Sequence, residues 1–467
     1  MTLVRRSGFS RLAALTALAV GCAGSVAMAA VPAAPAGVLR PVGISTGFGR
    51  DASSQRTITW LTKHTARLRA PQVTYATSCA AVDAGTGATQ AGSVKRLGAY
   101  LSGYDAATVT LTGLDPATSY CYRVSGARGA ARTSSRDLTF TTAPAAPTSV
   151  TFLDFADSQG TPASYATYWA STVRAATAAY PGAAFATHTG DMIDANTRAQ
   201  VTKFLASTGK AFGGLPLYPV LGNHEGTRYT ALFRQLFPQD AASARAGGGP
   251  AAPYALMDAI AYGPVLVLGL NSNYTGRAQI ARQVRWARAE IRAQGTAADG
   301  TARFVIVELH KSPYGGTHAG DTVTSKGMFG AGNLRKYLAP KLSRLGVDLV
   351  LAGHDHNYIR TFPIRADGTF QTGGSSRKPS TDQVSASADG LIWLIPRDSG
   401  LKTYGPARVD STHHPWIDYL WRAHGEKPGH TRPANDVYAA ITVNEAAITV
   451  VARTAAGETV DRFTVTR

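Results

Sequence analysis

The spacing of apolar and polar residues divides the chain into two parts. Between residues 41 and 142, runs of β-branched and aromatic residues alternate with turn residues, and clear runs lie at 57–60, 73–75, 109–112 and 121–124. Short strands separated by turns at this spacing are typical of a sandwich of two sheets. We therefore predict a small all-β sandwich domain over residues 41–142.

After a Pro/Ala-rich segment at 143–148, apolar strand-like runs alternate with helical stretches. Strands are expected at 150–155, 184–189, 217–221, 265–270, 304–309 and 347–351, and helices at 165–179, 278–294 and 331–345. This alternation predicts a layered α/β (α+β) domain over residues 150–467. Residues 436–467 return to alternating strands, which we expect at the closing edge of a sheet.

The first 29 residues have the pattern of a secretory signal peptide. Arg5 and Arg6 precede an apolar stretch at 12–20, and small residues end at Ala29, the expected cleavage site. The apolar stretch is much shorter than the roughly 20 residues that a membrane span requires. Residues 30–40 would then be a linker. We expect a secreted or periplasmic protein without a membrane span.

Two other export signals fit the same segment less well. Arg5 and Arg6 are also the core of a twin-arginine signal, but the flanking residues match poorly. Gly21 and Cys22 resemble a lipoprotein cleavage site, although Ala19 stands where a larger aliphatic residue is usual. Under each alternative the mature protein lies outside the cytoplasm.

Composition and charge narrow the range of partners. The chain has 47 Lys and Arg against 29 Asp and Glu, a formal charge of +18, and charged residues make up only 16% of it. A basic excess favours anionic partners such as phosphates, but the positive residues are scattered singly and form no dense nucleic-acid-binding segment. Three cysteines are too few for a disulfide scaffold or a cysteine-built zinc site. A small phosphorylated substrate fits this charge, and a nucleic-acid partner is not expected.

Polar residues with metal-binding chemistry lie where the expected strands of the second domain end. Five clusters occur in chain order: Asp-Ser-Gln at 157–159, Gly-Asp-Met-Ile-Asp at 190–194, Gly-Asn-His-Glu at 222–225, His310, and Gly-His-Asp-His at 353–356. Open α/β sheets place their active sites in such loops. Asp and Asn oxygens combined with imidazoles suit Zn²⁺, Mn²⁺ or Fe. A shared aspartate can bridge two cations about 3.5–4 Å apart that hydrolyse a phosphate ester.

This ordered set resembles the calcineurin-like metallophosphoesterase superfamily. Together with the preceding sandwich it is most similar to the purple acid phosphatase branch, whose last motif closely resembles Gly-His-Asp-His-Asn-Tyr-Ile-Arg at 353–360. The resemblance implies a two-sheet sandwich flanked by helices as the catalytic domain. It also implies a secreted hydrolase that cleaves phosphomonoesters through a dinuclear metal site and a bridging hydroxide. The implied cofactors are two divalent metal ions, Zn, Mn or Fe.

The resemblance also implies a role for individual residues. Asp157 would bind the first metal, Asp191 would bridge both metals, and His356 would complete the first site. The second metal would be held by Asn223, His310 and His354.

Three further residues would act on the substrate. His224, which is not a ligand, would contact the phosphate or protonate the leaving group, and Glu225 would orient its imidazole. His318 resembles a further substrate-facing histidine of the branch, although its spacing from His310 is not identical.

The chain departs from the family pattern at the first metal. Purple enzymes have a tyrosine three residues after the bridging aspartate, where this chain has Asp194, and the wider superfamily has a histidine where this chain has Gln159. Either Gln159 or Asp194 could supply the missing ligand through oxygen. Neither forms a coloured tyrosinate complex with Fe³⁺, so we expect a colourless enzyme that is active at neutral to mildly alkaline pH.

Residues 114–124 resemble the signature of fibronectin type III-like domains. Cys79 and Cys121 both lie in this domain, and a disulfide bond between them is expected in an oxidising compartment. Two buried free thiols are the alternative.

Other functions fit parts of the same pattern. Phosphodiesters, nucleotides and phosphoproteins are alternative substrates within the superfamily. A non-catalytic, metal-stabilised protein that binds a surface through the sandwich domain is an alternative of another class. A 5′-nucleotidase would need a large separate nucleotide-binding domain, for which too few residues follow His356.

Overall fold

The computed structural model describes residues 40–49, 51–63, 69–98, 101–128, 131–208, 210–226, 230–237, 258–316, 331–370, 378–405, 409–410, 413–424, 429 and 432–467. The expected signal peptide at 1–29, nearly all of the expected linker and His318 lie outside these residues.

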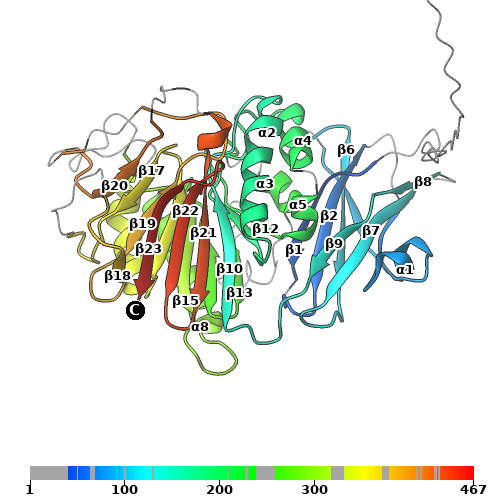
Figure 1. The fold of residues 1–467 in the computed structure, drawn as a ribbon, viewed down its shortest axis with the longest axis horizontal. Coiled ribbons are helices and arrows are strands. Elements are labelled where there is room, and N and C mark those ends of the chain that lie inside the picture. The colour runs from blue at the N-terminus through cyan, green and yellow to red at the C-terminus, as the bar shows by residue number, and fades with distance from the viewer. Residues whose placement is uncertain are drawn as a thin grey trace, which may run out of the picture. The chain divides into compact units, whose positions relative to one another are not determined.

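The N-terminal part of the structure is a sandwich of two antiparallel sheets (Figure 1). One sheet has the strand order β1-β2-β6-β5, and the other has the order β4-β3-β7-β8 with β9 paired to β7. The elements are β1 (Val42–Phe48), β2 (Arg56–Lys63), β3 (Arg69–Ala76), α1 (Cys79–Asp83), β4 (Ala88–Ala91), β5 (Ser93–Arg96), β6 (Tyr104–Leu111), β7 (Ser119–Arg128), β8 (Ala131–Ser134) and β9 (Leu138–Thr141). Trp60, Val73 and Tyr122 are fully buried between the sheets. The predicted all-β fold is confirmed.

Cys79 and Cys121 form a disulfide bond within this sandwich. The bond joins the start of α1 to β7, across 42 positions of sequence. The expected pairing is therefore confirmed, and the alternative of two free thiols is wrong. Disulfide bonds persist in oxidising compartments, in agreement with the expected export.

The larger domain contains two seven-stranded sheets. The first has the order β12-β11-β10-β21-β22-β23-β18, and the second has the order β13-β14-β15-β16-β19-β17-β20. The strands of the first sheet are β10 (Ser149–Phe155), β11 (Ala186–His188), β12 (Leu217–Pro219), β18 (Gln383–Ser385), β21 (Val437–Asn444), β22 (Ile448–Thr454) and β23 (Thr459–Thr466). Those of the second are β13 (Ala259–Tyr262), β14 (Val265–Gly269), β15 (Phe304–Lys311), β16 (Leu349–Gly353), β17 (Tyr358–Thr361), β19 (Ile392–Pro396) and β20 (Ile417–Trp421).

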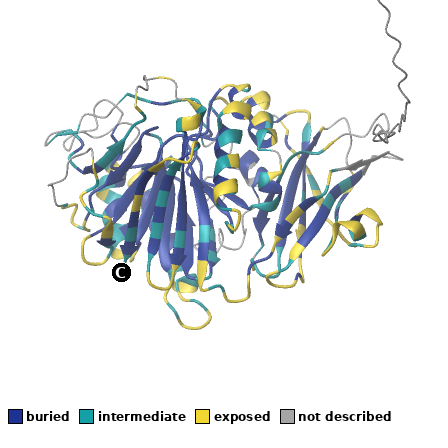
Figure 2. Ribbon diagram, in the orientation of Figure 1, coloured by how far each residue is buried: buried dark blue, intermediate teal, exposed yellow. Residues whose placement is uncertain are grey.

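The two sheets pack face to face, and helices cover their outer faces. Phe152 and Ile441 of the first sheet share one buried apolar cluster with Ile306 and Leu351 of the second. The helices on the first sheet are α2 (Ser164–Thr167), α3 (Trp169–Ala179), α4 (Arg198–Ser207), α5 (Ala211–Gly214) and α6 (Thr230–Leu236). Those on the second are α8 (Arg277–Gln294), the π-helical turn at Leu334–Leu338 and α10 (Ala339–Arg344). The short helix α9 (Ala331–Asn333) directly precedes that turn. Figure 2 shows that burial is concentrated on the strands of both sheets. The expected two-sheet sandwich flanked by helices is confirmed.

Two local expectations differ from the structure. The helix expected at 331–345 widens into a π-helical turn at Leu334–Leu338, since Pro340 lacks the N–H that an α-helix needs there. Residues 436–467 do not form the sheet edge, because β21 pairs with β10 near the centre and the short strand β18 lies outside β23. A 3₁₀ turn at Pro433–Asn435 precedes β21.

The β-sandwich packs on the helices of the first sheet. Tyr122 Oη donates to the carbonyl oxygen of Gly213 in α5 at 2.6 Å, and Ser45 Oγ donates to that of Leu236 in α6 at 2.9 Å. Within the described residues, no helix combines the length and apolar character needed to cross a membrane.

Candidate metal centre

The expected metal-binding clusters converge at one end of the two sheets. Asp157 follows β10, Asp191 follows β11 and Asn223 follows β12, which are parallel strands of the first sheet. His310 lies near the end of β15, and the cluster at 353–356 begins at the end of β16, its parallel neighbour in the second sheet. Because parallel strands present their carboxyl ends at one edge, five distant segments meet there.

Asp191 belongs to two groups of potential ligand atoms. One group comes from Asp157, Asp191 and His356, and the other from Asp191, His310 and His354. Within each group, the ligand atoms lie within 4.8 Å of one another. Asn223 Oδ1 lies 3.0 Å from His310 Nε2 and adds an amide oxygen to the second group. One carboxylate at the centre of two ligand groups is the arrangement that the sequence predicts for a pair of metal ions.

Backbone carbonyls orient two of the imidazoles. His310 Nδ1 lies 2.9 Å from the carbonyl oxygen of Thr189, and His356 Nδ1 lies 3.0 Å from that of Lys402. An Nδ1–H that donates to a carbonyl leaves the Nε2 lone pair for a metal. The Nε2 atoms point inward, since that of His310 lies 3.2 Å from Asp191 Oδ2 and that of His356 lies 3.4 Å from Asp157 Oδ1.

The backbone is strained at four of the expected ligands. Asp157, Asp191, His354 and His356 have φ values of 49°, 55°, 78° and 51°. Positive φ is uncommon for residues other than glycine. Such conformations cluster at functional sites, where the surrounding structure holds them in place.

Glycine at position 222 permits the close approach of two ligand loops. A Cβ at Gly222 would lie 2.0 Å from Asp191 Oδ1, so any larger residue would displace the shared carboxylate. This contact explains why a glycine precedes Asn223.

The buried carboxylates make the centre suitable for cations. Burial and the charge of Asp191 raise the pKa of Asp157 well above its usual range. Burial alone would raise the pKa of Asp191 too. Three facing imidazoles instead hold this pKa well below its usual range, those of His310, His224 and His354. Two neighbouring carboxylates that are shielded from water repel each other when both are ionised. A bound cation removes this repulsion, so the residues fit a metal site.

Gln159 and Asp194, the two candidates for the missing ligand, differ in their contacts. Gln159 is completely buried, and neither polar atom of its side chain has a hydrogen-bond partner. An unpaired buried amide is costly, and coordination of a cation would give its oxygen a partner. The Asp194 carboxylate instead forms an ion pair with the Lys402 ammonium group and is one third exposed.

Glu225 has a different position from the one that we expected. Its carboxylate accepts hydrogen bonds from the backbone N–H groups of Gly222, Asp191 and Ile193, at 2.8, 2.9 and 3.0 Å. The expectation that it orients the His224 imidazole is therefore wrong. Three convergent N–H donors hold this buried carboxylate, which ties the loop after β11 to the loop after β12.

His224 lies beside the two ligand groups. Its backbone N–H donates to Asp191 Oδ1 at 2.8 Å, and its Nδ1 lies 2.6 Å from the carbonyl oxygen of Asp194. Its Nε2 lies 3.9 Å from Asp191 Oδ2, and 29% of the side chain is exposed. An imidazole in this position can reach both the centre and solvent.

Two residues at the centre, Lys402 and Tyr404, were not predicted from the sequence. The Tyr404 ring lies 4.4 Å from the His356 ring between centroids, and Lys402 contacts both His356 and Asp194. Both follow β19, which pairs in parallel with β16 and also ends at this edge. The apolar run at 392–396 was the signal that would have identified their loop.

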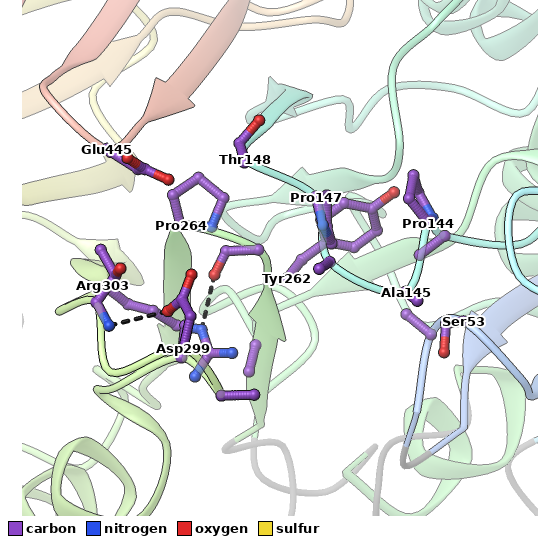
Figure 3. A pocket seen from close by; sticks show the side chains of 18 of the residues that line it. Ser53, Pro144, Ala145, Pro147, Thr148, Tyr262, Pro264, Asp299, Arg303 and Glu445 are labelled. Carbon is purple, nitrogen blue, oxygen red and sulfur yellow. Dashed lines mark hydrogen bonds between the residues drawn. The ribbon is translucent and has the colours of Figure 1, made fainter.

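A separate cavity lies at the opposite end of the sheets (Figure 3). It has a volume of about 330 Å³ and is lined by Thr148, Pro264 and Arg303, which precede β10, β14 and β15. None of the expected site residues lines it, so the cavity is not part of the candidate centre.

Two family models match the chain. The model of the purple acid phosphatase N-terminal domain matches residues 41–142, and the model of the calcineurin-like phosphoesterases matches residues 155–358. The comparison with curated proteins gave no match.

Two solved structures show weaker similarity. A computationally redesigned β-sandwich protein is 19% identical, covers 23% of this chain and 96% of its own, and has a TM-score of 0.16. Astrotactin-2, a vertebrate-specific, perforin-like membrane protein, is 13% identical, covers 20% of this chain and 19% of its own, and has a TM-score of 0.14. Scores this low support no argument about fold or function.

Proposed function

Since the chain belongs to the purple acid phosphatase-like branch of the calcineurin-like metallophosphoesterases, we propose that it hydrolyses phosphomonoesters at a site for two divalent metal ions. The main support for this proposal is the position of Asp191, since its carboxylate belongs to two groups of potential ligand atoms. One group would bind a single metal, whereas two groups with a common carboxylate suit a pair.

Each metal would have its own set of ligands: Asp157, Gln159, Asp191 and His356 for the first, and Asp191, Asn223, His310 and His354 for the second. When bound, two such ions lower the pKa of water and neutralise charge on a phosphoryl group. Both donor sets combine oxygen with imidazole nitrogen, as Zn²⁺, Mn²⁺ and Fe²⁺ prefer.

The chain itself supplies a proton donor. With Nδ1 held by the Asp194 carbonyl, the His224 Nε2 faces the centre and can carry a proton to a departing alkoxide. A metal-stabilised protein that only binds a surface has no need of this group. Its presence beside the ligands favours catalysis.

We also propose that the protein is exported. The signal-like segment at 1–29 and the disulfide bond between Cys79 and Cys121 both suit an oxidising compartment outside the cytoplasm.

The test is hydrolysis of p-nitrophenyl phosphate by the purified chain. Activity should disappear with a chelator and return with Zn²⁺ or Mn²⁺, and bis(p-nitrophenyl) phosphate should be a poorer substrate. Activity that is insensitive to chelation, or a preference for the diester, would contradict the proposal.

A further inference from the structure

The loop at 397–405 is a sixth segment of the candidate centre. It follows β19 and is anchored on both sides, since Ser399 N–H donates to the Ala156 carbonyl at 2.8 Å and Ser399 Oγ donates to the Val437 carbonyl at 3.0 Å. A Cβ at Gly400 would lie 2.6 Å from the carbonyl carbon of Ser158, so the loop lies directly against the segment that carries Asp157. These contacts hold the loop beside the ligands.

Lys402 uses its backbone and its side chain for different contacts. Its carbonyl oxygen lies 3.0 Å from His356 Nδ1, and its ammonium group forms an ion pair with Asp194. The backbone carbonyl of Asp194 in turn lies 2.6 Å from His224 Nδ1. Lys402 therefore connects a ligand of the first group, through its carbonyl, with the residue that holds the expected proton donor, through its ammonium group.

Exposure distinguishes these residues from the most deeply buried ligands. The side chains of Asp157, His310 and His356 are at most 1% exposed. His224, Asp194 and Lys402 are 29%, 34% and 33% exposed. These three residues lie on the solvent-facing side of the centre, together with the partly exposed ligands Asn223 and His354. A substrate that enters from their side meets the lysine.

We propose that Lys402 is a specificity-determining residue that binds a phosphoryl oxygen of the substrate, with Asp194 as its positioning residue. The inference rests on the proposed phosphatase function and deepens it. An ammonium group is a compact point charge that binds phosphate oxygens strongly. A partly exposed ion pair is weak, so the ammonium group can exchange the Asp194 carboxylate for a phosphoryl oxygen at little cost. A terminal phosphoryl group carries about one more negative charge than a diester, so Lys402 favours phosphomonoesters.

The test compares Lys402→Met with Lys402→Arg in the metal-loaded full chain. Methionine replaces the apolar stem of lysine and keeps the backbone carbonyl that holds His356, but it removes the charged end of the side chain. Lys341→Met, on α10 over the outer face of the second sheet, is the matched control. The measurements are metal content, the Kd of inorganic phosphate by calorimetry, and kcat/KM for p-nitrophenyl and bis(p-nitrophenyl) phosphate.

Lys402→Met should keep its metal and weaken phosphate binding roughly 10- to 100-fold, as expected for loss of a charged hydrogen bond. Its kcat/KM should fall more for the monoester than for the diester, arginine should restore most of both losses, and Lys341→Met should match the wild type. Unchanged phosphate affinity, or equal losses for both esters, would overturn the role of Lys402. If the wild type cleaves neither ester, the proposed function fails, and the phosphate affinities alone decide whether Lys402 binds phosphate.

Discussion

Replacement of Glu225 by alanine should destabilise the protein and disrupt its metal centre. The carboxylate is fully buried and accepts three backbone N–H groups, from Gly222, Asp191 and Ile193. These donors belong to two loops that carry Asn223 and the shared Asp191. Without the carboxylate, three buried donors lose their partner at once.

The size of the effect follows from these contacts. An unpaired buried N–H costs about 1–3 kcal/mol, and water entering the cavity would satisfy part of the loss. Glu225→Ala should therefore lower the free energy of unfolding by roughly 3–6 kcal/mol, which is large for one substitution. Glu225→Gln keeps one acceptor oxygen but turns an NH₂ group toward a donor, so it should cost about 1–3 kcal/mol.

Chemical denaturation in the presence of chelator measures the stability of each variant, and elemental analysis of the reloaded protein measures its metal content. Glu445→Ala, at an exposed glutamate, is the control and should change neither. We expect Glu225→Ala to lose metal together with stability, because the loop with Asn223 is no longer tied to Asp191.

A loss of turnover without a loss of metal or stability would contradict this role of Glu225. If Glu225→Ala kept its metal and stability but lost as much turnover as His224→Ala, the carboxylate would act on the imidazole, as its adjacency in sequence suggests. The three hydrogen bonds would then contribute little to the fold.

His224→Ala should retain its metal yet lose roughly 10²–10⁴ in kcat, the usual contribution of a positioned proton donor; equal losses for nitrophenyl and alkyl phosphates would leave it a phosphate contact only. Burial raises the pKa of Asp348 to about 6, against the opposing effects of the Val305 N–H and Arg467. Because the folded-state pKa exceeds the unfolded one, the wild type should lose about 3 kcal/mol of stability relative to Asp348→Asn as pH rises from about 3 to 7. A pH-independent difference between the two proteins in urea unfolding would contradict this. Metal-loaded protein should show no intense absorption band in the visible range, since Asp194 stands where purple acid phosphatases have a tyrosine. A purple band that Tyr404→Phe abolishes would show that Tyr404 reaches the metal instead.

Strand positions were predictable because buried strands leave long apolar runs in the sequence. The runs at 150–155 and 304–309 match β10 and β15 closely. The place of 436–467 within the first sheet was not predictable in this way. Pairing of β21 with β10 depends on which side of β10 remains open, and no local pattern encodes this.

The ligand set was predictable because each member lies in a short motif at a strand end. The role of Glu225 was not, because adjacency to His224 in the sequence says nothing about which atoms its carboxylate faces in the fold. Lys402 and Tyr404 have no motif of their own. They reach His356 only because β19 pairs with β16, more than 30 residues away in the chain.

The difference in contacts between Gln159 and Asp194 could not be predicted from the sequence either. Both residues offer an oxygen at a plausible spacing. Only the structure shows that Lys402, from a distant loop, forms an ion pair with Asp194. It also shows that the Gln159 side-chain amide is buried without a hydrogen-bond partner.

If the Asp191 carboxylate serves two metal ions, the metal stoichiometry of the protein must show it. Elemental analysis of the wild type and of Asp191→Ala, each reloaded with Zn²⁺ or Mn²⁺ and freed of excess metal, provides the measurement. We expect two ions per chain in the wild type. Asp191→Ala should lose at least one ion and nearly all phosphatase activity. One ion per chain in an active wild type, or full metal content and activity in Asp191→Ala, would contradict this role of Asp191.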